Sequence, residues 1–259
     1  MMFCSIREVL YYNRPIEVAT VTVFHNSLKG LEKLIPTIHG YFKAHIFIDG
    51  IYKNWPMTEE QKKGNGLSTD GSRELILDYA KISVRKITLL DTPFKSEYEK
   101  RMMYLDAELL IRELGVNAIL ILDSDEYVNL KETNWELFYA DLDNKINKKH
   151  HGSWNVYGIP VSEYVPQRGF DNYQDYPSLW YKPWDMIYKP QSHYQFINCR
   201  WELTRHFNDN YSQYPIDKIE GIKVYHDHGV REEGYTQSKE EYHSWLRQHE
   251  QDLVNRKYR

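Results

Sequence analysis

The first half of the chain alternates short apolar runs with segments in which apolar residues recur at helical spacing. An unbroken run of large apolar residues is typical of a strand buried on both faces. An apolar residue at every third or fourth position instead predicts a helix with one buried stripe. Alternation of the two predicts a mostly parallel sheet covered by helices, an α/β fold. We expect strands at 18–24, 45–48, 84–90 and 118–122, and helices at 28–41, 73–80 and 97–114.

The second half of the chain does not continue this pattern. From Trp154 to Tyr211 aromatic residues recur every few positions with prolines between them, and no secondary structure is predicted there. The charged tail from Lys239 to Arg259 is predicted to be helical, with Tyr242 among its docking residues. We therefore expect one domain in two parts. Residues 1–130 form the sheet-based half, and residues 131–259 form an aromatic-rich half with a helical tail.

Polar side chains follow the predicted strands. His25 follows the first strand, Asp49 ends the second, Asp91 follows the third, and Asp123-Ser124-Asp125 follows the fourth. The carboxyl ends of parallel strands lie along one edge of a sheet, so these groups are expected to lie close together. Carboxylate oxygens suit Mg2+ and Mn2+, which commonly take their other ligands from phosphates and water. The sequence therefore predicts a divalent cation and a phosphorylated substrate at this edge.

A second group of candidate metal ligands lies near the end of the chain. His226 and His228 flank Asp227. Because side chains alternate along a strand, the two imidazoles would share one face, at a spacing that is common in metal sites. A pair of surface histidines in a loop is the alternative interpretation. The pattern does not choose between the two histidines as the ligand.

Composition narrows the classes of function. The 259 residues carry a formal net charge of -4, which argues against a general nucleic-acid binder. Two cysteines cannot form a disulfide framework, and no apolar run approaches the roughly 18 residues of a transmembrane helix. We expect a cytoplasmic protein, and peripheral contact with a membrane is left open. The 22 Tyr, 9 Phe and 7 Trp suit a core, a sugar platform or a homodimer surface.

Several of these features together resemble the GT-A fold glycosyltransferases, particularly the family-two-like group. Those enzymes carry a D-x-D motif, matched by Asp123-Ser124-Asp125, and an acidic residue after the second strand, matched by Asp49. They also open the next helix with a stretch like Ser68-Thr69-Asp70-Gly71-Ser72. A basic residue on the helix before the D-x-D strand is matched by Arg101, in Lys100-Arg101. The resemblance covers residues 17–130.

The resemblance implies a metal-dependent transfer of a sugar from a UDP- or GDP-linked donor to a hydroxyl of a carbohydrate, glycolipid or glycoprotein. Residues 1–130 would bind the nucleotide sugar and residues 131–259 the acceptor, within one GT-A domain. It also implies a role for individual side chains. Asp49 would accept hydrogen bonds from the base or ribose, Asp123 would face the ribose or the metal through water, Asp125 would bind Mn2+ or Mg2+ directly, His226 or His228 would complete the metal site, and Arg101 and Lys95 would stabilise the phosphates.

The residue that would deprotonate the acceptor hydroxyl is not fixed by spacing, and the second half offers five candidate carboxylates, Glu163, Asp171, Asp175, Asp185 and Glu202. Asp185 lies between Trp184 and Met186, where desolvation would raise the pKa of a carboxyl group, so it is the expected base of an inverting reaction. A retaining reaction needs no base at that place. Trp180, Tyr181 and Trp184 are the aromatic candidates for the acceptor site, since neighbouring prolines predict a loop.

Other classes of function compete with this hypothesis. A non-catalytic protein of the same fold, which binds a carbohydrate or a protein partner, is the main alternative. A phosphatase with an aspartate nucleophile expects its D-x-D near the start of the domain, whereas here the motif follows the fourth strand. A nucleotidyltransferase expects a glycine-rich phosphate loop after the first strand, and His25-Asn26-Ser27 supplies none.

Overall fold

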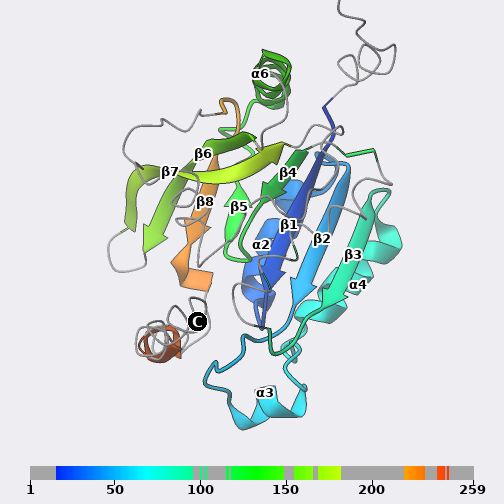
Figure 1. Cartoon of the computed structure of the whole chain (residues 1–259), viewed down its shortest axis with the longest axis vertical. Helices are drawn as coiled ribbons and strands as arrows, with labels where there is room; N and C mark the ends of the chain where they lie inside the picture. The colour runs from blue at the N-terminus through cyan, green and yellow to red at the C-terminus, as the bar shows by residue number, and fades with distance from the viewer. Residues whose placement is uncertain are drawn as a thin grey trace, which may run out of the picture.

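The structure, a computed structural model, describes residues 16–95, 100, 103, 115–116, 118–148, 155–165, 169–181, 219–230, 238–242 and 244. Within this part of the chain, eight strands form one sheet in the order β3-β2-β1-β4-β7-β6-β8-β5 (Figure 1). The strands are β1 (Val18–Phe24), β2 (Ala44–Asp49), β3 (Lys86–Asp91), β4 (Ala118–Ile121), β5 (Glu126–Val128), β6 (Asn155–Val165), β7 (Gly169–Tyr181) and β8 (Val224–Asp227). The helices are α2 (Leu28–Ile38), α3 (Glu59–Lys63), α4 (Ser72–Ile82), α6 (Trp135–Lys148) and the 3-10 turn η2 (His228–Val230).

The strands predicted from the first half of the sequence form the parallel part of the sheet. β1 pairs in parallel with β2 on one side and with β4 on the other, and β2 pairs in parallel with β3. Of the seven pairings between described strands, four are parallel. Helices α2 and α4 lie together on one face of this part (Figure 1). The predicted α/β fold with a mostly parallel sheet is therefore confirmed.

Helix α2 shows how the sequence pattern produces this packing. Leu31, Leu34, Ile35 and Ile38 recur at helical spacing, and each is at most 2% exposed. The helix ends at Ile38 rather than at the predicted residue 41. Gly40 follows with a φ of +85°, a left-handed conformation that ends a helix and that favours glycine. The turn lets the chain enter β2 directly.

The second half of the chain extends the same sheet. β7 pairs antiparallel with β4 and with β6, so strands from both sides of residue 130 belong to one sheet. No strand is predicted here from the sequence, and the predicted loop is wrong for Trp180 and Tyr181, which lie in β7. Pro177 pairs with Gly158 at a register shift of the ladder, where a strand tolerates proline. A proline at such an irregularity resembles a loop signal in the sequence.

The link between β2 and α4 is long, and it is anchored to the edge of the sheet at its base. Ile51 N donates to Gly66 O at 2.7 Å, which joins the outgoing and returning segments. Phe94 N donates to Ile51 O at 2.9 Å, which fastens this base to the loop after β3. Helix α3 lies beyond the carboxyl ends of the parallel strands (Figure 1). We call residues 51–67 the insertion.

The insertion also contacts the helical segment near the end of the chain. Tyr242 is 3% exposed, and its ring stacks on Tyr52 at a centroid distance of 5.9 Å and lies 5.2 Å from Trp55. Tyr242 therefore docks the tail on the insertion, at the carboxyl-end side of the sheet. Among the described helices, none is both long and apolar enough to cross a membrane.

Stability is expected to fall as the pH drops from about 6.5 to about 4, because of His45 on β2. His45 is 2% exposed; burial, together with the charges of His39 and Arg85, lowers its pKa from 6.5 to about 4. Because the unfolded chain binds the proton more readily than the folded protein, protonation of His45 lowers the free energy of unfolding progressively between pH 6.5 and pH 4, by up to about 3 kcal/mol. Its Nδ1 lies 2.8 Å from Thr20 Oγ1.

The variant His45→Phe tests this expectation, because phenylalanine keeps a flat ring in the strand and removes the titration. Urea unfolding at pH 7, 5.5 and 4 measures the free energy of unfolding. The difference between wild type and variant should shift in favour of the variant as the pH falls. A difference that is constant across the three pH values would contradict the assignment to His45.

Candidate functional site

The carboxyl end of β4 forms a closed turn that presents Asp125. Glu126 N donates to Asp123 O at 3.0 Å, and Asp123 N donates to Glu126 Oε2 at 2.8 Å. Glu126 is 1% exposed, so the side chain that closes this turn is itself fixed. The Asp125 side chain is 15% exposed. The turn thus gives Asp125 a defined position with its carboxylate partly exposed at the carboxyl end of β4.

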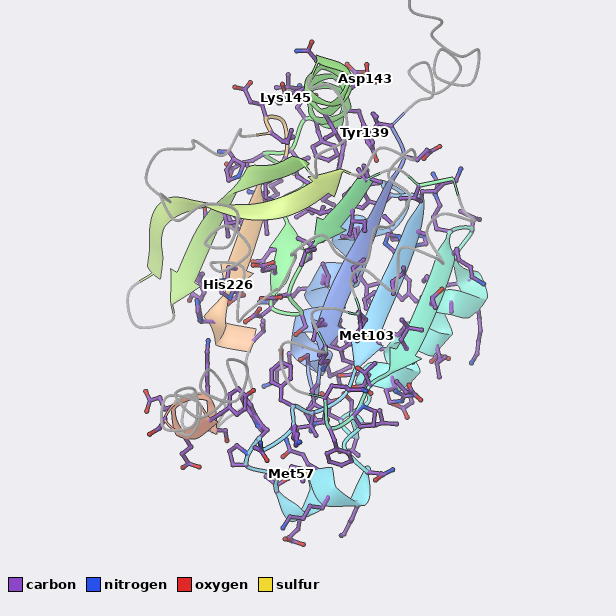
Figure 2. The ribbon with its side chains drawn as sticks, in the orientation of Figure 1. Met57, Met103, Tyr139, Asp143, Lys145 and His226 are labelled. Carbon is purple, nitrogen blue, oxygen red and sulfur yellow. The ribbon has the colours of Figure 1, made fainter. Side chains whose placement is uncertain are left out.

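Strand β8 brings His226 to this carboxylate. β8 pairs antiparallel with β5, with His226 opposite Glu126, and Asp227 N donates to Asp125 O at 2.8 Å. His226 Nε2 lies 3.2 Å from Asp125 Oδ2, although the two residues are 101 positions apart. The ring of His228, on η2, lies 4.2 Å from the His226 ring. Figure 2 shows His226 at the end of β8, below the sheet's centre. The two histidines and Asp125 therefore meet at one place.

The donor set at this place fits a hard divalent cation that keeps open positions. Two ligands on neighbouring positions of an octahedral Mg2+ lie about 3 Å apart, because each bond is about 2.1 Å. The 3.2 Å between Asp125 Oδ2 and His226 Nε2 matches that spacing. Within the described ranges, no group of three or more His, Cys, Asp and Glu side chains has metal-binding geometry. Asp125 and His226 alone could hold a cation only with phosphate oxygens and water as its other ligands.

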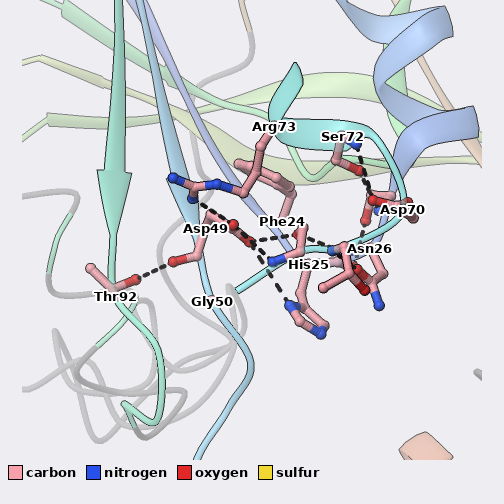
Figure 3. A network of polar contacts seen from close by, with 12 residues as sticks. Phe24, His25, Asn26, Asp49, Gly50, Asp70, Ser72, Arg73 and Thr92 are labelled. Carbon is pink, nitrogen blue, oxygen red and sulfur yellow. Dashed lines mark hydrogen bonds and ion pairs between the residues drawn. The ribbon is translucent and has the colours of Figure 1, made fainter. Parts of the chain in front are cut away.

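Asp49 is the centre of a second polar network, at the carboxyl end of β2 (Figure 3). Its carboxylate is fully buried and accepts hydrogen bonds from Ser68 N at 3.0 Å, Ser68 Oγ at 2.6 Å and Arg73 Nη1 at 2.8 Å. Arg73 Nη1 also lies 2.8 Å from Asp91 Oδ1. Burial opposes ionisation of Asp49, but the nearby His25 ring, 3.8 Å away, and the hydrogen bonds from Ser68 and Arg73 outweigh it and lower its pKa to about 2.

The same network joins two loops at the edge of the sheet. Asn26 N donates to Ser68 Oγ at 2.8 Å, and Leu28 N donates to Asp70 Oδ2 at 2.8 Å. The Ser68 hydroxyl, by donating to Asp49, completes a chain from the first loop to β2. The predicted contact of Asp49 with a base or ribose stays a prediction. The structure shows a different contribution. The buried Asp49 carboxylate holds Ser68, and Ser68 in turn accepts a hydrogen bond from Asn26 N, which fixes the loop from residue 25 to residue 28.

Lys100 belongs to the pair Lys100-Arg101 that matches the resemblance, but the phosphate role is predicted for Arg101 and not for Lys100. It is 1% exposed, and its ammonium donates to Phe24 O at 2.9 Å and to Gly50 O. It also lies 5.1 Å from the centre of the Tyr52 ring. A lysine beside Arg101 on an amphipathic helix gives no sequence signal of burial, because both residues look like solvent-facing cations.

The remaining predicted site residues are placed as follows. Lys95 is exposed in the loop after β3, where its main-chain oxygen accepts Lys53 N at 2.8 Å. Asp123 lies at the start of the turn that presents Asp125. Arg101 and Asp185 lie outside the described residues. The structure therefore brings Asp123, Asp125, His226 and His228 to one region, and it places Lys95 at the same edge of the sheet.

Comparison with known proteins gives remote likenesses only. No family model matches the chain, and no curated protein matches it. S. aureus TarS 1-349 in complex with UDP is 15% identical over 61% of this chain, at a TM-score of 0.38. A197 from STIV is 11% identical over 83% of this chain and 88% of its own, at 0.39. A 4-diphosphocytidyl-2C-methyl-D-erythritol synthase is 7% identical over 80% of this chain and 90% of its own, at 0.40.

This chain spans only 38% of the length of the UDP-bound TarS structure. At these identities and scores, we infer function from the residues of the chain itself.

Proposed function

We propose that this protein is a metal-dependent glycosyltransferase of GT-A type, which moves a sugar from a nucleoside-diphosphate sugar to an acceptor hydroxyl. The observation that carries the proposal is the meeting of Asp125 and His226, at 3.2 Å, beside the carboxyl ends of parallel strands. In open parallel sheets, ligands bind outside the carboxyl ends of the strands at the topological switch point, where the strand order reverses. Here β1 lies between β2 and β4, which makes the ends of β1 and β4 that place.

The roles proposed for the side chains follow from their positions. Asp125 and His226 would hold Mn2+ or Mg2+, with His228 beside them. The imidazole nitrogen favours Mn2+ over Mg2+, because it is a softer donor than a carboxylate oxygen. A cation bound there would stabilise negative charge on the leaving nucleoside diphosphate. Asp123 would face the ribose or a metal-bound water.

Cationic side chains and the general base complete the proposal. Lys95, exposed at the same edge, and Arg101 would bind the phosphates. Asp185 would take the proton from the acceptor hydroxyl in an inverting reaction, and strands and loops after residue 130 would hold the acceptor. A UDP- or GDP-linked donor and a carbohydrate, glycolipid or glycoprotein acceptor remain the proposed substrates.

Nucleotide binding that requires Mn2+ is the expected result of a first test. Thermal unfolding is measured with UDP, GDP, CDP and ADP, each with and without Mn2+. One nucleotide should raise the Tm only when Mn2+ is present, because a ligand at about 100 times its Kd adds about 2.7 kcal/mol to the free energy of unfolding. The nucleotide that gives the shift identifies the base of the donor.

The other outcomes separate the competing classes of protein. Equal shifts with and without Mn2+ would leave nucleotide binding and contradict the metal. No shift with any of the four nucleotides would contradict the transferase and favour a protein that binds a carbohydrate or partner without catalysis. Hydrolysis of the matching nucleotide sugar then tests the reaction, and the amount of nucleoside diphosphate released is the quantity measured.

A further inference from the structure

Helix α2 has a second stripe of residues that faces the candidate metal site instead of the apolar core. Ser27 precedes the helix, and Gly30, Lys33 and Thr37 follow at intervals of three or four, which places them on one side of it. Ser27, Lys33 and Thr37 contact the turn after β4, β8 and β5, respectively, and Gly30 lets the turn approach the helix closely. The stripe escapes hydrophobic-pattern analysis because it is polar or small at every position.

The first turn of α2 fits closely against the loop that carries Asp125. Ser124 Oγ donates to Ser27 Oγ at 2.9 Å. A methyl group at position 30 would overlap the main-chain oxygen of Ser124, so glycine alone lets the helix approach this closely. Farther along the helix, Val128 N donates to Thr37 Oγ1 at 3.1 Å. α2 therefore sets the position of the turn and of β5.

Lys33 extends this arrangement to β8. Its ammonium lies 2.6 Å from Asp227 Oδ2. The Asp227 side chain is 6% exposed, and its other oxygen accepts Gly229 N at 2.9 Å, within the turn that carries His228. Asp227 N in turn donates to Asp125 O. Asp227 thus joins three parts of the site: its carboxylate contacts α2 and the turn that carries His228, and its main-chain N contacts Asp125 O.

We propose that Lys33 is a positioning residue for the metal site, a role that rests on the proposed function. By holding Asp227, Lys33 fixes β8 so that His226 Nε2 lies beside Asp125 Oδ2. Removing a residue that hydrogen-bonds to a metal ligand or its support commonly weakens metal affinity by about 10 to 100-fold. Lys33 is 48% exposed but Asp227 only 6%, so loss of the cation leaves a buried carboxylate and is expected to lower the Tm as well. A loss of metal affinity that Lys33→Arg restores then separates positioning from stability.

The test compares Mn2+ affinity in matched variants of the full chain. Free Mn2+ is followed by electron paramagnetic resonance, with the nucleotide chosen by thermal shift present in every sample. Lys33→Met should weaken Mn2+ binding about 10-fold, whereas Lys33→Arg should restore most of it, since the guanidinium keeps the charge. Lys43→Met is the control, because Lys43 pairs with Glu17 at 3.4 Å and both side chains are 38% exposed.

A double-mutant cycle assigns the effect to the pair. If Lys33 acts through Asp227, the variant Lys33→Met/Asp227→Asn should bind Mn2+ no more weakly than the worse single variant. Unchanged affinity in Lys33→Met, with normal binding in the wild type, would overturn the positioning role and leave the metal site intact. Equal losses in Lys33→Met and Lys43→Met would also overturn it. Failure of the wild type itself to bind Mn2+ would overturn the metal site and this role together.

Discussion

Replacement of Asp125 by alanine is expected to weaken Mn2+ binding at least about 100-fold, more than the loss of a residue that only supports a ligand. The carboxylate is the hard oxygen donor of the site, and it lies 3.2 Å from the imidazole that would share the cation. The fold should persist, because the turn is held by Glu126 and β8 by a main-chain hydrogen bond to Asp125 O, and none of these contacts uses the Asp125 side chain. Isothermal titration with Mn2+ and the selected nucleotide measures the affinity, and the Tm without ligand measures the fold.

Asp143→Ala is the matched control for this experiment. Asp143 is an exposed carboxylate on α6, at the top of Figure 2 and well separated from His226, which lies near the middle of that view. That variant should bind Mn2+ and nucleotide as the wild type does. If Asp125→Ala keeps wild-type affinity for Mn2+, the metal assignment is wrong. If it loses affinity together with a large fall in Tm, the turn depends on the side chain more than its contacts indicate.

Replacement of Asp49 by asparagine is expected to cost about 3 kcal/mol of stability at pH 7, because it breaks a buried ion pair. The amide cannot accept from Ser68 and Arg73 as the carboxylate does. The pKa of Asp49 is about 2 in the folded protein, compared with 3.8 for an aspartate in the unfolded chain. Its contribution is therefore complete above pH 3.8 and is lost as the pH falls through 2, a change of about 2 kcal/mol.

Urea unfolding of wild type and variant at pH 7, 4 and 2 measures this contribution. The gap between the two proteins should be widest at pH 7 and should shrink as the pH approaches 2. Asp78→Asn is the control, because Asp78 pairs with Lys81 and its side chain is 72% exposed. A gap of the same size at every pH would show that Asp49 stabilises the fold without its charge. Since His45 titrates at higher pH, the two effects occur in separate windows.

The parallel part of the fold could be predicted because its signals are local. A strand buried on both faces, such as β1, is apolar at nearly every position, and α2 repeats its buried residues at helical spacing. The ends of these strands follow from the same pattern, so the region of the candidate site was also predictable. The polar residues at the strand ends are visible in the sequence as exceptions to an apolar run.

The contacts within the site depend on distant residues and could not be predicted in the same way. Lys33 meets a partner 194 positions away, and no pattern within α2 indicates it. Gly30 is a glycine within a helix, and only the loop packed against it explains why. β6 and β7 escaped prediction because aromatic residues and prolines obscure their alternation. Such features arise from packing between elements, which a single sequence shows only indirectly.

The anchored base of the insertion has a consequence for how this protein can vary. Because Ile51 and Gly66 are joined by a main-chain hydrogen bond, the segment between them leaves and re-enters the sheet edge at nearly one point. Its length is thus decoupled from the spacing between Asp49 and Ser68, which the carboxylate itself maintains. Evolution, or an engineer, can exchange this segment for a longer or shorter one and leave the contact between Asp49 and Ser68 in place.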